Sequence, residues 1–143
     1  MREVRREVEI DAPPSAVWAV LSDTRSYPDW NPFIRRLEGD LREGAKLSVL
    51  IEPPGARAMT LKPTVLAVIP ERELRWLGRF LIPGLCDGGH SVRIEPTGDG
   101  RTRFTQAETF TGILVPALKG TLVKVETGFE QMNEALKSRA EAQ

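Results

Sequence analysis

The chain has 143 residues, a length that suits one domain with its own hydrophobic core. Twenty basic residues balance twenty acidic ones, so the chain lacks the positive charge on which nucleic-acid-binding proteins rely. A single cysteine excludes an internal disulfide, and a single histidine excludes a metal site built from several histidines. We therefore expect one domain over residues 1–143 that uses no metal, cofactor or nucleic acid.

The N-terminus "MREVRREVEI" is charged from its second residue, which is not the pattern of a secretory signal. The longest apolar runs, "VLAVI" and "ILVPAL", are far shorter than the roughly 20 residues of a membrane-spanning helix. These features predict a cytoplasmic protein that does not insert into a membrane.

The first two elements follow from a change of hydrophobic period. Apolar residues alternate with charged ones over residues 2–10, which predicts a strand with one wet face. A helix is expected from Pro13 and Pro14 to about Asp23, because prolines suit a helix start and Val17, Val20 and Leu21 recur at helical spacing.

The stretch "YPDWNPFIRR" then places Tyr27, Trp30 and Phe33 around two prolines, where we expect a loop. Two interpretations are open at this point. The aromatic side chains could anchor the loop to the core, or they could form a rigid apolar gate beside a cavity.

Six further strand-like runs follow, and residues with turn chemistry separate them. Short connections between consecutive strands favour an antiparallel meander. The runs cover residues 33–39, 46–52, 61–69, 73–81, 90–96 and 102–110.

The last segment changes to helical spacing and predicts one long helix over residues 114–139. Charged residues such as Lys124 and Glu130 fill the positions expected to be wet. The apolar face comprises Leu114, Leu118, Leu122, Val125, Phe129, Met132 and Leu136.

The segments "IDAPPSAVWAVLSDTRSYPDWNPFI", "ELRWLGRF" and "GFEQMNEALKSRAE" resemble the START-like SRPBCC superfamily, in particular its polyketide cyclase/dehydrase and lipid transport branch. The resemblance implies an α+β helix-grip fold. In this fold a curved seven-stranded antiparallel sheet wraps around the long C-terminal helix, and two short helices follow the first strand. It also implies an apolar tunnel between sheet and helix, with the aromatic loop at its mouth.

The last hairpin yields the most local prediction. Pairing Ile94 with Phe104 puts apolar residues on one face, places His90 opposite Glu108, and needs a three-residue loop over residues 98–100. Two interpretations of His90 and Glu108 remain open. They could satisfy each other as a structural pair, or they could anchor a ligand's polar end or transfer protons.

Further candidates lie on the neighbouring strand, where Gly78 leaves room between Trp76 and Phe80. Cys86 is expected in a turn beside "DGG" and has no assigned role. The full set of expected ligand-binding residues is Tyr27, Trp30, Phe33, Trp76, Phe80, His90, Val92, Gln106, Glu108, Phe110, Val125, Phe129 and Met132.

Three functional classes fit this pattern. The leading one is a protein that binds or carries a small hydrophobic molecule such as a lipid, an isoprenoid, a quinone or a polyketide. The second is a cyclase- or dehydratase-like enzyme with His90 and Glu108 as acid and base. The third is a co-chaperone-like interaction module, which an exposed apolar patch outside the cavity would favour.

Overall fold

A computed structural model describes residues 1–80 and 84–143, although the side chain of Phe80 is outside the described part. The strands are β1 (Arg2–Ile10), β2 (Ile34–Glu38), β3 (Ser48–Ile51), β4 (Met59–Leu61), β5 (Thr64–Ile69), β6 (Glu73–Phe80), β7 (Cys86–Gly98) and β8 (Arg101–Thr111). The helices are α1 (Pro14–Ser22), α2 (Tyr27–Trp30) and α3 (Lys119–Glu141), with 3₁₀ turns η1 (Thr24–Ser26) and η2 (Val115–Leu118).

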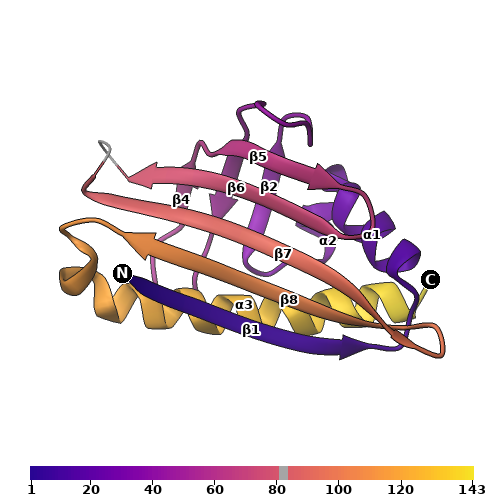
Figure 1. Ribbon diagram of the computed structural model, residues 1–143. Coiled ribbons are helices and arrows are strands. Elements are labelled where there is room, and N and C mark those ends of the chain that lie inside the picture. Colours follow the sequence, from indigo (N-terminus) through magenta and orange to yellow (C-terminus); the bar gives the residue numbers. More distant parts are fainter. Residues whose placement is uncertain (81–83) are drawn as a thin grey trace.

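The strands form two antiparallel sheets on either side of the core. One has five strands in the order β1-β8-β7-β6-β5, and the other has three in the order β2-β3-β4. The long helix α3 runs beside β1 and β8, and the three-stranded sheet lies behind the five-stranded one (Figure 1). The expected α+β arrangement with a long C-terminal helix is confirmed.

The expected single sheet of seven strands is wrong. The strand expected over residues 61–69 belongs to two strands, because Leu61 is the last residue of β4, which pairs with β3, and Thr64 begins β5, which pairs with β6. Pro63 stands at the division, and its missing backbone N–H cannot contribute to a ladder. The chain therefore changes sheets at this proline.

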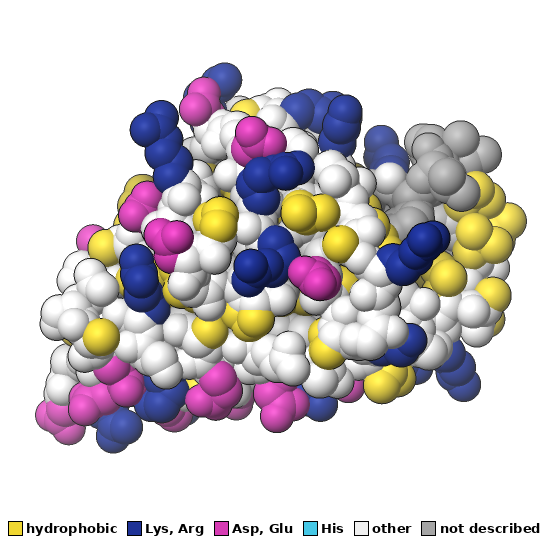
Figure 2. All heavy atoms as spheres, turned by 180° about the vertical axis from the view of Figure 1, so that it is seen from behind, with side chains coloured by type: hydrophobic (Ala, Val, Ile, Leu, Met, Phe, Trp, Pro, Cys, Tyr) yellow, Lys and Arg dark blue, Asp and Glu magenta, His cyan; other side chains and the backbone are white. Residues whose placement is uncertain are grey.

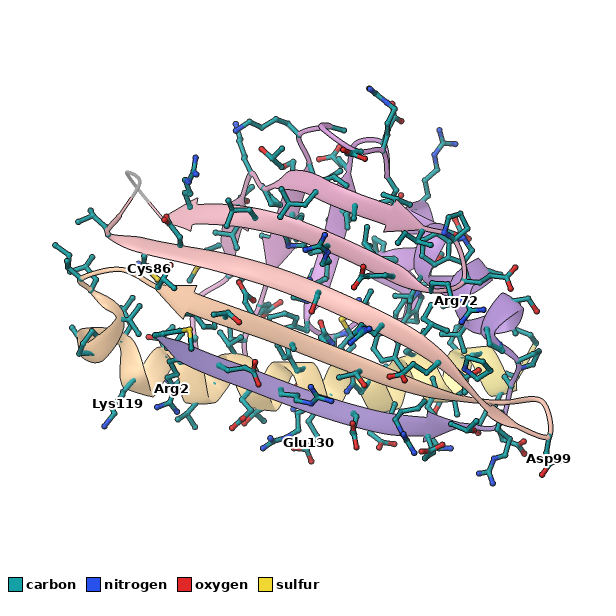
Figure 3. The ribbon with its side chains drawn as sticks, in the orientation of Figure 1. Arg2, Arg72, Cys86, Asp99, Lys119 and Glu130 are labelled. Carbon is teal, nitrogen blue, oxygen red and sulfur yellow. The ribbon has the colours of Figure 1, made fainter. Side chains whose placement is uncertain are left out.

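Helix α3 begins at Lys119, later than the expected residue 114, because the segment around Pro116 forms the 3₁₀ turn η2. Its burial follows the predicted pattern, since Val125 and Phe129 are buried while Lys124 and Glu130 are exposed. Figure 3 shows Glu130 on the outer side of α3, and its carboxylate lies 3.5 Å from Arg6 Nε of β1. No helix in residues 1–80 and 84–143 combines the length and the apolar character needed to cross a membrane.

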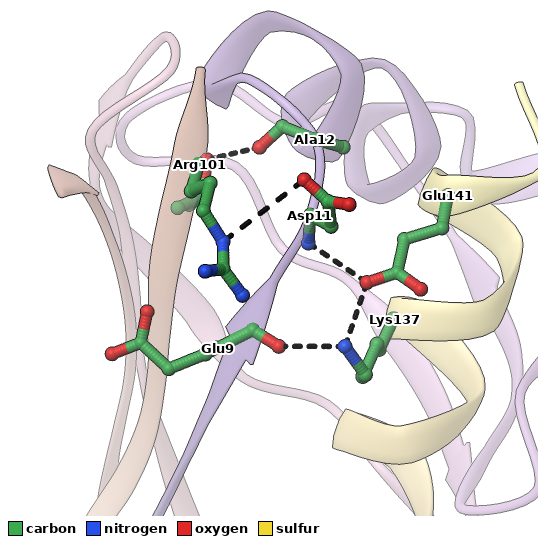
Figure 4. Close-up of polar contacts among 7 residues, drawn as sticks. Glu9, Asp11, Ala12, Arg101, Lys137 and Glu141 are labelled. Carbon is green, nitrogen blue, oxygen red and sulfur yellow. Dashed lines mark hydrogen bonds and ion pairs between the residues drawn. The ribbon is translucent and has the colours of Figure 1, made fainter. Parts of the chain in front are cut away.

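The end of α3 is tied to the end of β1 by a small polar cluster (Figure 4). The backbone N–H of Asp11 donates to Glu141 Oε2 at 2.7 Å, and Lys137 Nζ donates to the same oxygen at 2.7 Å and to the Glu9 carbonyl at 3.0 Å. The hydrogen bond from Lys137 holds the pKa of Glu141 below its ordinary value, with the backbone N–H of Asp11 adding to the effect. These contacts fix how far α3 extends along β1.

The β7–β8 hairpin has the expected register, with Ile94 opposite Phe104 and His90 opposite Glu108. Its turn differs in detail from the expected three-residue loop. Gly98 pairs with Arg101, and a bulge between Pro96 and Gly98 takes up the extra residue. Because β7 already begins at Cys86, the "DGG" segment lies in the strand and not in the expected turn.

Candidate ligand-binding cavity

A cavity of about 320 Å³ lies between the two sheets and the first half of α3. Its walls are mostly apolar, and polar side chains interrupt them at a few points, among them His90 and Glu108. The three-stranded sheet contributes Val49, Ile51, Met59 and Leu61, the five-stranded sheet Trp76, Cys86 and Phe110, and α3 Thr121, Leu122 and Val125.

The cavity has a buried inner end and a half-buried outer end. Trp76 and His90 are 7% and 4% exposed, whereas Leu61 and Leu118 are half-buried and Arg79 is exposed. Figure 2 shows hydrophobic side chains gathered at one end of the molecule. We therefore place the mouth between β4, the end of β6 and η2.

Two glycines paired across β6 and β7 shape the wall of the cavity. Gly78 lies opposite Gly88, and both line the cavity. A Cβ atom at Gly88 would collide with the carboxylate of Glu108, so the missing side chain makes the space in which that carboxylate lies. A Cβ atom at Gly78 would meet nothing closer than Pro63 Cβ at 3.9 Å.

His90 is held in place by a chain of hydrogen bonds that ends on α3. Its Nε2 lies 2.9 Å from Gln106 Oε1, and Gln106 Nε2 donates to Asn133 Oδ1 at 3.0 Å. The ring also stacks on Trp76, with centroids 4.6 Å apart. Since the partner of Nε2 is an acceptor oxygen, Nε2 carries the proton and Nδ1 presents a lone pair.

The ionisation of His90 follows from this setting. Burial lowers its pKa to about 4, and the hydrogen bond with Gln106 partly offsets that effect. Its Nδ1 is buried and has no hydrogen-bond partner among the described residues. The ring is thus a neutral acceptor at physiological pH.

Glu108 is half-buried and lines the cavity. Burial raises its pKa to about 8, because the enclosure disfavours the charged form. The carboxyl group forms no hydrogen bond within residues 1–80 and 84–143. The Glu108 carboxyl is therefore mostly protonated at neutral pH, and its O–H can donate a hydrogen bond to a ligand.

The expected contact between His90 and Glu108 is only partly present. The two residues are cross-strand neighbours, as the register required. Their side chains form no hydrogen bond with each other, since His90 bonds Gln106 and the Glu108 carboxyl lies against Gly88. One of the two interpretations expected His90 and Glu108 to satisfy each other, whereas the hydrogen-bond partner of His90 is Gln106.

Of the three aromatic residues after the first helix, only Phe33 lines the cavity. Its ring lies against Gly128 of α3 and meets Phe129 edge-on at 5.5 Å. Tyr27 is buried and donates from its hydroxyl to the Leu21 carbonyl at 2.7 Å. Trp30 is half-buried and packs against Tyr27 at 5.3 Å, so both lie in the positions of core anchors.

The other expected residues divide between wall and core. Trp76, His90, Glu108, Phe110 and Val125 line the cavity with Phe33. The side chain of Phe80 lies outside the described residues. Val92, Gln106, Phe129 and Met132 are buried but do not line the cavity.

Sequence reasoning missed the wall supplied by the three-stranded sheet. Val49 and Ile51 alternate on β3, and Met59 and Leu61 alternate on β4, so each strand presents one face to the cavity. That alternation was visible in the sequence, but the partner of each face was not. Among residues 1–80 and 84–143, no three His, Cys, Asp or Glu side chains are grouped to hold a metal ion.

Comparison with solved structures shows the same fold in proteins of low sequence identity. The chain resembles the Zhui aromatase/cyclase from Streptomyces sp. R1128, with 20% identity, 98% of this chain and 93% of that chain covered, and a TM-score of 0.78. It also resembles a START superfamily protein from Mycobacterium smegmatis, with 22% identity, 98% and 97% covered, and a TM-score of 0.74.

A third similar structure is norcoclaurine synthase from Thalictrum flavum in complex with dopamine and hydroxybenzaldehyde. Identity is 18%, the match covers 96% of this chain and 84% of that chain, and the TM-score is 0.72. No curated protein matches the chain. The model of one family, described as polyketide cyclase / dehydrase and lipid transport, matches residues 1–141, and the chain belongs to this family.

Proposed function

We propose that this protein binds a small hydrophobic molecule in the cavity between its two sheets and α3. The cavity itself carries the proposal, since side chains from all three layers leave about 320 Å³ unfilled. Protein interiors are normally packed at the density of organic crystals, so an unfilled apolar space costs stability. A ligand that fills this space would recover the missing contacts.

The size and lining of the cavity favour a compact ligand. Ligand sites commonly enclose about 300–1,000 Å³, and this cavity lies near the lower end of that range. Trp76, Phe110 and Phe33 present aromatic surfaces to it. A fused-ring polyketide-like, quinone or isoprenoid ligand suits these walls better than a lipid with two acyl chains.

Filling the cavity from within tests the proposal. Gly78→Leu points a side chain into the cavity, and the backbone there has no positive φ that would oppose the change. We expect the affinity for an uncharged naphthalene probe, measured by titration calorimetry, to fall at least tenfold.

Gly89→Leu is the matched control. Gly89 lies on the neighbouring strand β7 and does not line the cavity, and a Cβ atom there would meet nothing within 4 Å. This variant should bind the probe as the wild type does. Equal probe affinity in the Gly78→Leu variant and the wild type would refute the proposed site.

A dehydratase-like enzyme is the second candidate. It is favoured by one observation, a protonated carboxyl and an unpartnered imidazole nitrogen in the same cavity. His90 Nδ1 would accept the α-proton of a β-hydroxy ketone, and Glu108 would give its proton to the departing hydroxyl, yielding an enone and water. Mass spectrometry of a naphthyl β-hydroxy ketone incubated with wild type and Glu108→Gln would detect this product, and its absence with the wild type would remove the candidate.

A further inference from the structure

Two polar residues that line the cavity, Glu108 and His90, each carry a group without a hydrogen-bond partner among the described residues. The donor is the carboxyl of Glu108, seated over Gly88. The acceptor is Nδ1 of His90, whose other ring nitrogen is already engaged by Gln106. Buried polar groups without partners are costly, so this pair indicates what a ligand should supply.

Resting on the proposed function, we propose that the ligand is an uncharged molecule with a carbonyl group at its buried end, and that the carboxyl of Glu108 donates a hydrogen bond to this carbonyl oxygen. Glu108 thereby acts as a specificity residue, selecting a neutral carbonyl against both anions and cations.

The charged groups around Glu108 support this choice. His90 of β7 lies opposite Glu108, and burial keeps its imidazole neutral at physiological pH. Arg79 of β6 is exposed and pairs with Asp87 of β7 at 3.9 Å, and Arg2 at the start of β1 lies opposite Phe110. Cys86 of β7 also lines the cavity, and burial, followed by the nearby Glu108, raises the pKa of its thiol. On the helix side the wall consists of uncharged residues, namely Thr121, Leu122 and Val125.

This environment leaves the carboxyl without a counter-ion, and burial accordingly raises its pKa to about 8. A carboxylate ligand would lose its hydration among mostly apolar walls. An ammonium ligand would need Glu108 to ionise in an apolar enclosure. A ketone requires neither change.

The surroundings of His90 and Glu108 also favour Glu108 as the donor to the ligand. The ring of His90 stacks on Trp76, meets Phe129 edge-on and bonds Gln106, so its contacts are with residues other than Glu108. The Glu108 carboxyl lies directly against Gly88, where a Cβ atom would displace it. A donor held in this way discriminates ligands by whether they present an acceptor oxygen.

Four probes with the same naphthalene body separate the alternatives. They are 2-acetylnaphthalene, 2-ethylnaphthalene, 2-naphthoate and 2-(aminomethyl)naphthalene. At pH 6.5 titration calorimetry should show the ketone binding about tenfold more tightly than the hydrocarbon, the value of one well-made hydrogen bond. The carboxylate and the amine should bind more weakly than the ketone.

Variants and pH assign the preference to Glu108. Glu108→Gln keeps a donor in its amide N–H, so it should retain most of the ketone preference, whereas Glu108→Leu should lose it and still bind the hydrocarbon. At pH 9.5 the wild type should lose the preference, because its carboxylate no longer donates, while Glu108→Gln should keep it. Glu134→Leu, at an exposed position on α3, is the matched control and should behave as the wild type does.

The outcomes separate this inference from the proposed function. If the ketone and the hydrocarbon bind equally well, or if the carboxylate or amine binds most tightly, the inference is wrong while the cavity remains a binding site. If Glu108→Leu keeps the full ketone preference, the inference is also wrong. If none of the four probes binds, the proposed function fails and takes this inference with it.

Discussion

At the scale of single residues, the most consequential feature is the buried polar chain from His90 through Gln106 to Asn133. Gln106 is fully buried and uses both ends of its amide, accepting from β7 and donating to α3. It therefore links a cavity wall residue to the helix that closes the core. Gln106 therefore contributes to stability by giving hydrogen-bond partners to buried polar atoms of both His90 and Asn133.

Gln106→Leu should lower the free energy of unfolding by about 2–4 kcal/mol, because it leaves His90 Nε2 and Asn133 Oδ1 buried without partners. Urea denaturation monitored by circular dichroism measures this change. Gln131→Leu, at an exposed position of α3, should alter stability by less than about 0.5 kcal/mol. Equal unfolding midpoints for the two variants would show that the chain of hydrogen bonds contributes little.

At the scale of elements, α3 and the segment after α2 come close together at Gly128. Phe33 lies where a Cβ atom of Gly128 would be, and its ring forms part of the cavity wall. Glycine normally weakens a helix interior by about 1 kcal/mol relative to alanine. In this protein the close approach of the two elements accounts for the glycine.

Gly128→Ala should therefore destabilise the protein despite the better helix propensity of alanine, because the new methyl group displaces Phe33. Gly120→Ala, near the start of the same helix, meets nothing within 4 Å and should be neutral or stabilising by up to about 1 kcal/mol. Thermal unfolding of the two variants gives the comparison. A rise in melting temperature for both would mean that Phe33 does not need the space.

The sequence predicted these elements unevenly. The β7–β8 register could be predicted because two-residue alternation on both strands admits few pairings that keep Ile94 and Phe104 on one face. The hydrogen-bond partner of His90 could not be predicted, because the choice between Glu108 and Gln106 depends on the space beside Gly88, which the Glu108 carboxyl occupies. The role of Phe33 depends on a contact with α3 that lies almost a hundred positions away in the chain.

At the scale of the whole molecule, two buried groups near the cavity have pKa values shifted in opposite directions. His90 falls from 6.5 to about 4, and Glu108 rises from 4.5 to about 8. Between pH 4.5 and 6.5 their effects on stability oppose each other, since the unfolded chain binds the proton of His90 while the folded chain keeps the proton of Glu108. Above pH 6.5 only Glu108 still differs between the two states.

The free energy of unfolding should therefore fall by about 1–2 kcal/mol as pH rises from 6.5 to 8, because the folded state holds a proton that the unfolded state has released. Urea titrations at several pH values measure the slope. Glu108→Gln should remove this fall and Glu134→Gln should leave it unchanged. A wild-type stability that rises over this range would contradict a protonated Glu108.

A crystal structure of the protein with 2-bromonaphthalene, with an anomalous map at the bromine edge, would show whether the cavity binds a small hydrophobic molecule. We expect a bromine peak enclosed by Trp76, Phe110 and Leu122, and no such peak in crystals of Gly78→Leu treated in the same way. Bromine peaks confined to the outer surface, with the space between the sheets and α3 closed by side chains, would contradict it.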